Sequence, residues 1–166
     1  MNRRRPAWLL DALVVALLAA VFVPISIARL VDADEGTYLL VSRLTMEGRL
    51  LYHEVHYPQM PLLPHVYGLW MWLFGPSWYA GRVLSSVFAV LLGWLLFRHV
   101  ARLTADRALG AFAALVLASS TLAFAWYSTV KTFALGTLLL FAAYAVLYEP
   151  ALRRWRYVAS GLLLGF

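Results

Sequence analysis

The sequence predicts an all-α protein, a polytopic transmembrane helical bundle with an interfacial helix and a re-entrant segment in its first outer loop. Of the 166 residues, 63% are hydrophobic and 13% are charged, a composition too apolar for a soluble domain of this size. The arginines fall in short clusters between long apolar runs, which is typical of cytoplasmic loops. The net charge of +6 therefore does not indicate nucleic-acid binding. The chain has no cysteine, which excludes disulfides and thiolate chemistry.

The first expected helix covers residues 7–28, a run long enough to cross a hydrocarbon core of roughly 30 Å. Arg3, Arg4 and Arg5 precede it and predict a cytoplasmic N-terminus. The run is too long for a signal peptide, and no small-residue cleavage site follows it, so we interpret it as a retained signal anchor. Asp11 lies near its cytoplasmic end, where the carboxylate can reach the lipid headgroups.

The outer loop is expected over residues 29–78. Within it, residues 36–48 have a loosely amphipathic helical pattern, with apolar side chains on one side of the helix and polar side chains on another. This pattern predicts a short helix lying in the membrane interface. Residues 61–74 are apolar but short and contain two prolines. If they span the membrane, the cluster of Arg98, Arg102 and Arg107 lies outside. If they are re-entrant, the cluster lies inside, as the positive-inside rule prefers, and we favour this second topology.

Further helices are expected over residues 79–97, 108–126 and 133–147, joined by a short outer turn that contains Lys131 and by an inner loop. Residues 157–166 begin another helix that is too short to cross a membrane. Residues 1–166 are therefore expected to be the N-terminal part of a longer transmembrane domain.

Three carboxylates crowd the end of the first helix, those of Asp32, Asp34 and Glu35. A carboxylate at a membrane boundary is costly to desolvate and marks a candidate functional site. Asp34 could accept the proton of an attacking hydroxyl group. The alternatives are a hydrated loop carboxylate or a helix N-cap. Asp32 and Asp34 also have a D-x-D spacing that can hold a divalent metal, although the expectation is that no metal is bound.

Two cations are expected on the same outer side, Arg82 near the end of a helix and Lys131 in a turn between two spans. Both are placed to meet a lipid phosphate, because a phosphate leaving group needs donors where its charge develops. The alternative for each is a side chain that extends to the headgroups without a binding role.

The sequence resembles the family 39 membrane glycosyltransferases, which have the GT-C fold and include protein O-mannosyltransferases and lipid A aminoarabinose transferases. The resemblance runs from about residue 29 to residue 166. It is carried by five segments in order, 34–38 (DEGTY), 47–52 (EGRLLY), 61–64 (PLLP), 73–77 (LFGPS) and 81–85 (GRVLS). The chain has Gln59-Met60-Pro61 where aminoarabinose transferases carry Glu-Lys-Pro.

The resemblance implies an inverting enzyme that moves a sugar from a polyprenyl-phosphate donor to a hydroxyl of a glycan, lipid or protein acceptor. The reaction would take place on the outer face of the plasma (inner) membrane and would need no cofactor. Asp34 is the implied base, Glu35 the acid that binds acceptor or orients the site, and Arg82 the family arginine. A transporter or flippase, or a non-catalytic membrane subunit, is the alternative function.

Overall fold

The computed structural model describes residues 7–148 and 153–165. Within these ranges the chain is helical, with one isolated β-bridge between Leu51 and Val55 and no strand, so the all-α prediction is confirmed. The helices are α1 (Ala7–Ala28), α2 (Ala33–Met46), α3 (Leu62–Phe74), α4 (Trp78–Thr104), α5 (Arg107–Ser119), α6 (Thr121–Trp126), α7 (Thr132–Leu147) and α8 (Arg154–Leu164).

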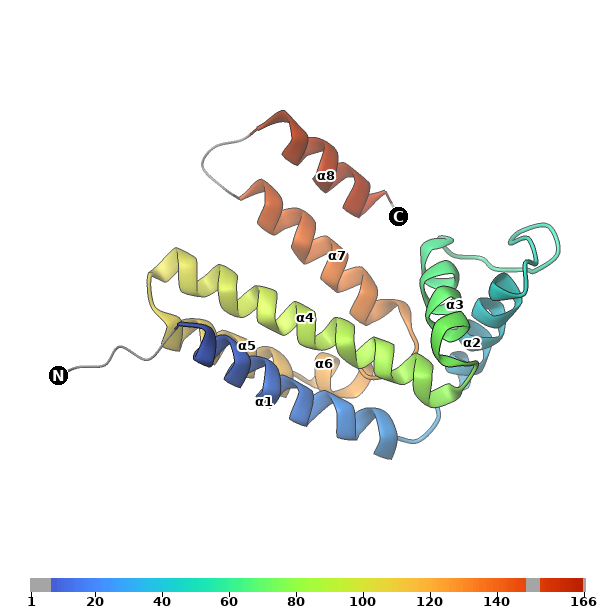
Figure 1. Cartoon of the computed structure of the whole chain (residues 1–166), viewed down its shortest axis with the longest axis horizontal. Coiled ribbons are helices and arrows are strands. Elements are labelled where there is room, and N and C mark those ends of the chain that lie inside the picture. Colours follow the sequence, from blue (N-terminus) through green and yellow to red (C-terminus); the bar gives the residue numbers. More distant parts are fainter. Residues whose placement is uncertain (1–6, 149–152, 166) are drawn as a thin grey trace.

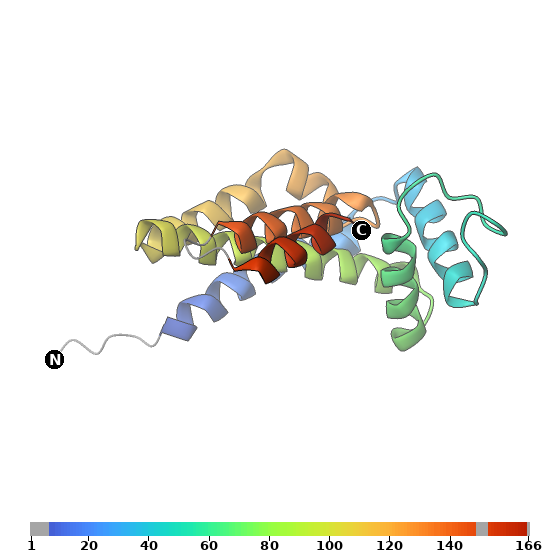
Figure 2. The same ribbon diagram turned by 90° about the horizontal axis from the view of Figure 1, so that it is seen from above.

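Helix α4 is the centre of the arrangement. It packs against α1, α5 and α7, and α8 packs on the outer side of α7 (Figure 1). Helices α2 and α3 pack on each other at the end of the bundle where α4 begins, and both are steeply inclined to α4 (Figures 1 and 2). The chain therefore forms a bundle with a helical pair at one end.

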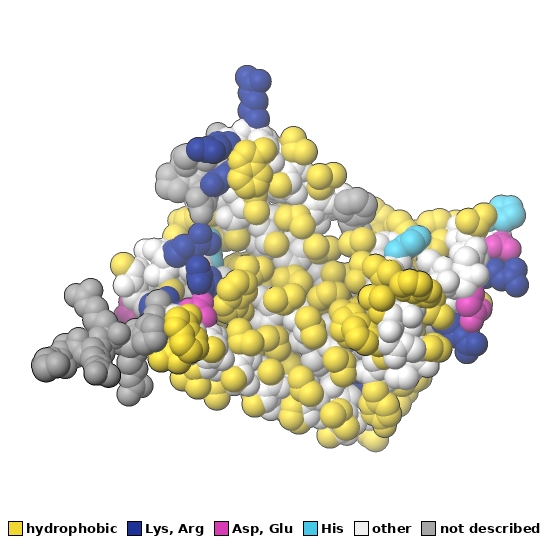
Figure 3. Space-filling model, in the orientation of Figure 1, with side chains coloured by type: hydrophobic (Ala, Val, Ile, Leu, Met, Phe, Trp, Pro, Cys, Tyr) yellow, Lys and Arg dark blue, Asp and Glu magenta, His cyan; other side chains and the backbone are white. Residues whose placement is uncertain are grey.

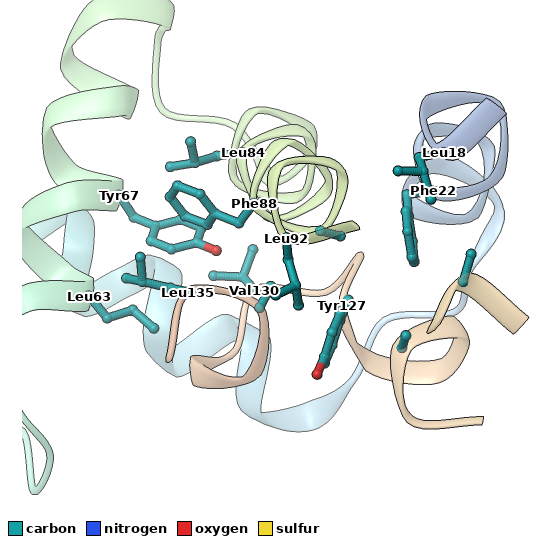
Figure 4. Packing of buried hydrophobic residues seen from close by; sticks show 14 of the residues in the cluster. Leu18, Phe22, Leu63, Tyr67, Leu84, Phe88, Leu92, Tyr127, Val130 and Leu135 are labelled. Atoms are coloured by element: carbon teal, nitrogen blue, oxygen red, sulfur yellow. The ribbon is translucent and has the colours of Figure 1, made fainter. Parts of the chain in front are cut away.

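Large apolar side chains fill the space between these helices (Figure 4). Leu18 and Phe22 of α1 face α4, and Tyr67 of α3 packs edge-on against Phe88 of α4, with ring centroids 6.0 Å apart. Helices α1 and α4 approach closely at Gly93, where an added Cβ would lie 2.7 Å from a methyl carbon of Leu18. A larger residue at this position would force the Leu18 side chain to move.

Among the residues that the structure describes, two helices are long and apolar enough to cross a membrane, over Trp8–Ala28 and Trp78–Thr104. Helices α3, α5 and α7 are apolar but shorter. Hydrophobic side chains cover much of the face shown in Figure 3. The exposed apolar side chains of the described residues include Leu13 and Leu17 of α1 and Phe112 of α5. An exposed apolar surface this extensive is unusual for a soluble monomer.

The structure differs from the single helix expected over residues 108–126. Helix α5 ends at Ser119, and Ser120 has an extended backbone with ψ of 140°. The Ser120 hydroxyl accepts a hydrogen bond from the backbone N–H of Ala123 at 3.3 Å and so begins α6. Serine side chains compete in this way with the helical backbone, and the uniform apolarity of the segment hides the break.

Other boundaries also move. Helix α4 continues to Thr104, beyond the expected end at residue 97, and α8 begins at Arg154 rather than at residue 157. The expected interfacial helix over residues 36–48 corresponds to α2, which begins earlier, and the segment over residues 61–74 forms α3.

Candidate functional site

The N-terminus of α2 is fixed by a capping box. Asp32 is the N-cap residue, and its Oδ1 accepts a hydrogen bond from the backbone N–H of Asp34 at 3.1 Å. Glu35, three residues after the cap, accepts a hydrogen bond from the backbone N–H of Asp32 at 3.5 Å. These reciprocal bonds satisfy backbone donors that a helix start leaves open. The cap is therefore Asp32, and the alternative interpretation of Asp34 as the N-cap is wrong.

Glu35 forms a buried ion pair with Arg82 of α4. The side chains are 0% and 2% exposed, and Oε2 of Glu35 lies 2.7 Å from Nη2 of Arg82. Nε of Arg82 is 3.2 Å from both carboxylate oxygens. Oε1 of Glu35 also accepts the backbone N–H of Val130 at 2.9 Å, so this one carboxylate connects α2, α4 and the segment between α6 and α7.

Arg82 also binds the end of α1. Its Nη1 donates to the carbonyl oxygens of Ser26 at 3.0 Å and Arg29 at 2.8 Å, and its Nη2 donates to the carbonyl oxygen of Leu30 at 3.1 Å. A cation here is favourable because the last carbonyls of a helix lack partners and carry negative partial charge. Together with the hydrogen bonds to Glu35, these bonds engage every N–H group of the Arg82 guanidinium.

This geometry bears on the expected phosphate-binding role of Arg82. In this structure the guanidinium has no donor left for a phosphate, and its charge is compensated by Glu35. What the side chain does here is hold the end of α1 against α2 and α4. Similarly, the Glu35 carboxylate faces the interior, where an acceptor molecule cannot reach it.

A second ionic cluster, formed by Lys131, Asp32 and Asp34, lies at the start of α2 and is more exposed than the first. Nζ of Lys131 is 2.7 Å from Oδ1 of Asp32 and 3.0 Å from Oδ2 of Asp34. The Lys131 side chain is 10% exposed, whereas that of Asp34 is 67% exposed. Nζ of Lys131 also lies 4.5 Å from the ring centroid of Trp126, and the guanidinium of Arg29 lies 4.7 Å from the same centroid.

Asp32 and Lys131 each favour the charged form of the other. The hydrogen bond from Lys131, helped by the backbone N–H of Asp34, lowers the pKa of Asp32. Desolvation works against the Lys131 ammonium, but the hydrogen bonds to Asp32 and Asp34 outweigh it and raise the pKa of Lys131. The ordinary values already leave a carboxylate and an ammonium charged near neutral pH, and both shifts strengthen that state.

All four residues predicted for catalysis and phosphate binding therefore gather at one place, where α1 ends and α2, α4 and α7 begin. They form two ion pairs, the buried pair of Glu35 with Arg82 and the pair of the mostly buried Lys131 with the exposed Asp34. Sequence reasoning missed the participation of Trp126 and of the Val130 backbone. No spacing rule could have found them, because Val130 lies 95 positions from its partner Glu35.

The D-x-D carboxylates hold an ammonium group in this structure. Lys131 occupies the position between Asp32 and Asp34 that a divalent ion would need. Over residues 7–148 and 153–165, no group of three or more histidine, cysteine or acidic side chains is arranged to hold a metal.

An apolar groove of about 480 Å³ is lined in part by Thr132, the residue after Lys131. Gln59 is another of its lining residues. The Gln59 side chain is held by a hydrogen bond from Nε2 to the Tyr38 hydroxyl at 2.9 Å. The remaining lining residues are apolar apart from Gly136: Met60, Leu62, Leu63, Leu135, Gly136, Leu139, Leu140, Leu163 and Leu164.

Compared with protein-family models, curated proteins and solved structures, the chain matches none of them. Over its described part, the chain is helical and has two helices long and apolar enough to span a membrane.

Proposed function

We propose that the protein is a multi-pass membrane glycosyltransferase, with its N-terminus in the cytoplasm and its active site on the outer face of the plasma membrane. The proposed reaction transfers a sugar from a polyprenyl-phosphate donor to a hydroxyl acceptor. Its main support is the exposed Asp34 carboxylate, held 3.0 Å from the Lys131 ammonium, together with an apolar groove that includes Thr132, the residue after Lys131.

Asp34 is the proposed general base. Its carboxylate is the more exposed partner of Lys131, and it lies on the first turn of α2, where the helix dipole stabilises negative charge. In the proposed step, the acceptor oxygen gives its proton to Asp34 and forms a bond to the anomeric carbon of the sugar. The bond from that carbon to the phosphate oxygen breaks, and the polyprenyl phosphate leaves with the electron pair. A single displacement inverts the anomeric carbon.

Lys131 is the proposed contact for the donor phosphate. Its ammonium sits at the start of α7, one residue from the groove wall. In the absence of donor it is neutralised by Asp32 and Asp34, so the phosphate must replace one of these carboxylates. Release of Asp34 from Lys131 would free that carboxylate to accept the proton.

The buried pair of Glu35 and Arg82 has a positioning role in this scheme. Every donor of Arg82 is engaged by protein oxygens. We therefore propose that Arg82 holds the helix ends together and that Glu35 orients the site. Neither side chain is proposed to contact a substrate.

The groove suits an isoprenoid chain. Its lining is formed mostly by aliphatic side chains of α7, α8 and the start of α3, with Gln59 and Thr132 as its polar side chains. A polyprenyl phosphate has the same division into a long apolar tail and a charged head. The head would meet Lys131 when the tail lies between α3, α7 and α8.

A non-catalytic membrane subunit is the second candidate. It is favoured by one observation, that both Asp32 and Asp34 are satisfied by Lys131 without any ligand. In that case the cluster serves only to hold α7 against the start of α2.

The test is sugar transfer from a labelled polyprenyl-phosphate donor in membranes that contain the protein, comparing wild type with Asp34→Asn. The expected result is an inverted product in the wild type and a loss of about 100-fold or more in the variant, the usual contribution of a general base. Glu47→Gln is the matched control, because Glu47 is an exposed acid at the other end of α2, paired with Arg43. Equal transfer by Asp34→Asn and wild type would remove the base assignment, and no transfer by wild type would favour the non-catalytic subunit.

A further inference from the structure

The end of the bundle opposite Asp34 has a polar hollow, which is separate from the apolar groove. It has a volume of about 470 Å³ and lies between the start of α1, the end of α4 and the start of α5. Its polar and aromatic lining consists of Trp8, Asp11, Trp94, Arg98, Arg102 and Arg107. Figure 3 shows basic side chains, drawn in dark blue, at the end of the molecule where α1 begins.

Asp11 organises the cations of this hollow. Its Oδ1 accepts a hydrogen bond from Nη1 of Arg98 at 3.0 Å and from the indole N–H of Trp94 at 3.3 Å. Its Oδ2 accepts a hydrogen bond from Nη2 of Arg107. One carboxylate of α1 therefore fixes one arginine of α4 and one of α5, so both guanidinium groups are oriented before any ligand arrives.

Basic side chains outnumber acidic ones in the described lining of the hollow. Three of these lining residues are arginines and one is an acid. The nearby Asp106 carboxylate is used at the start of α5, where it accepts the backbone N–H of Ala108 at 2.7 Å. Arg98 and Arg107 are 47% and 38% exposed, and their guanidinium carbons lie 5.7 Å and 5.2 Å from the ring centroids of Trp94 and Phe97.

We propose that this hollow binds the headgroup phosphate of an anionic phospholipid. The inference rests on the proposed membrane embedding, but not on the transferase reaction. Because α1 and α4 are long enough to cross the hydrocarbon core, their paired ends reach the headgroup region. The exposed Trp8 is an aromatic residue of the kind that concentrates at this depth.

A lipid phosphate fits the chemistry of the hollow. A guanidinium binds a phosphate diester through paired N–H groups, and basic pockets between membrane helices on the cytoplasmic side bind anionic headgroups. The acyl chains would lie along the apolar surfaces of α1 and α5, where Leu13 and Phe112 are exposed.

The experiment uses native mass spectrometry of the detergent-solubilised protein with equimolar phosphatidylglycerol and phosphatidylcholine. The wild type should retain phosphatidylglycerol in preference to phosphatidylcholine. Arg98→Gln and Arg102→Gln should each reduce that preference about fivefold, the size expected for one basic residue near anionic lipid. Arg102→Gln leaves the contacts of Asp11 in place and so serves as the second variant if Arg98→Gln does not fold. Arg43→Gln, the same charge change on α2 at the other end, should leave the preference unchanged.

Equal retention of the two lipids by the wild type would overturn the proposal, as would an unchanged preference in both folded variants. Displacement of the bound lipid by millimolar inorganic phosphate would assign the hollow to a free anion and contradict a lipid site. A protein that stays soluble and monodisperse without detergent would contradict the membrane embedding itself. Sugar transfer reports on the Asp34 site separately from each of these results.

Discussion

Arg82 and Glu35 are 47 positions apart in the sequence, yet Nη2 of the arginine and Oε2 of the glutamate lie 2.7 Å apart in the interior. The pair connects the end of α1, the start of α2 and the first turns of α4. It is joined to the contact of Asp34 with Lys131 through the backbone, because Glu35 follows Asp34 and Val130, whose N–H binds Glu35, precedes Lys131. The buried pair and the Asp34–Lys131 contact therefore lie on the same two chain segments.

The first prediction concerns removal of one partner of this pair. Arg82→Met should lower the free energy of unfolding by about 3–5 kcal/mol, because Glu35 would remain as an uncompensated buried charge. Thermal or denaturant unfolding in detergent measures the effect. The double variant Arg82→Met/Glu35→Leu should recover part of the loss. A single variant as stable as Arg43→Met, which removes an exposed arginine, would contradict the structural role assigned to the pair.

The second prediction concerns the contact between α1 and α4. Gly93→Ala should destabilise the protein by about 1–3 kcal/mol, the usual range for overpacking a close contact, because its Cβ would lie 2.7 Å from Leu18 Cδ1. Gly136→Ala is the matched control, since no heavy atom lies within 4 Å of its added Cβ. It should be neutral or stabilising, as alanine is the better helix former. Equal effects of the two substitutions would show that the helices do not approach at Gly93.

The third prediction is a pH dependence of the Asp32–Lys131 contact. Because the pKa of Asp32 is lowered by folding, its contribution to stability is present above the ordinary carboxyl value of about 3.9. That contribution is lost as the pH falls through the folded-state pKa. Asp32→Asn keeps a side chain that can cap the helix and removes the charge. Unfolding measured from pH 7 to pH 3 should show the variant less stable at pH 7 and the difference shrinking toward pH 3. A difference that stays constant over this range would contradict the ionic contact.

The fourth prediction separates donor binding from structure. Lys131→Gln should weaken binding of the polyprenyl-phosphate donor, measured as a rise in KM, because the phosphate loses its proposed cation. Lys131→Arg keeps the charge and should restore part of the binding. If Lys131→Gln leaves KM unchanged and lowers only the unfolding temperature, the residue serves only to hold the start of α7.

Much of the helical organisation could be predicted from the sequence, because long apolar runs and arginine clusters carry that information. The start of α2 is also marked in the sequence, because Asp32 and Glu35 have the spacing of a capping box. The break at Ser120 could not be found in this way, because two serines in an apolar segment are compatible with a continuous helix.

The site was only partly predictable for a different reason. Its acidic residues are neighbours in the sequence, but the partner of each depends on the packing of distant helices. Arg82 and Lys131 were both expected to meet a phosphate, and the structure separates them. Arg82 is enclosed by carbonyl oxygens, whereas Lys131 lies between two carboxylates beside the groove. Burial, which decides this difference, is set by the tertiary contacts of α1, α2 and α4.

The most direct test of the central claim is the single-turnover rate of sugar transfer from donor already bound to the protein, in wild type and Asp34→Asn. This rate isolates the chemical step from donor binding. The account predicts a fall of about 100-fold or more in the variant, with donor binding retained and Glu47→Gln at the wild-type rate. A rate for Asp34→Asn within a few-fold of wild type would contradict the assignment of Asp34 as the base.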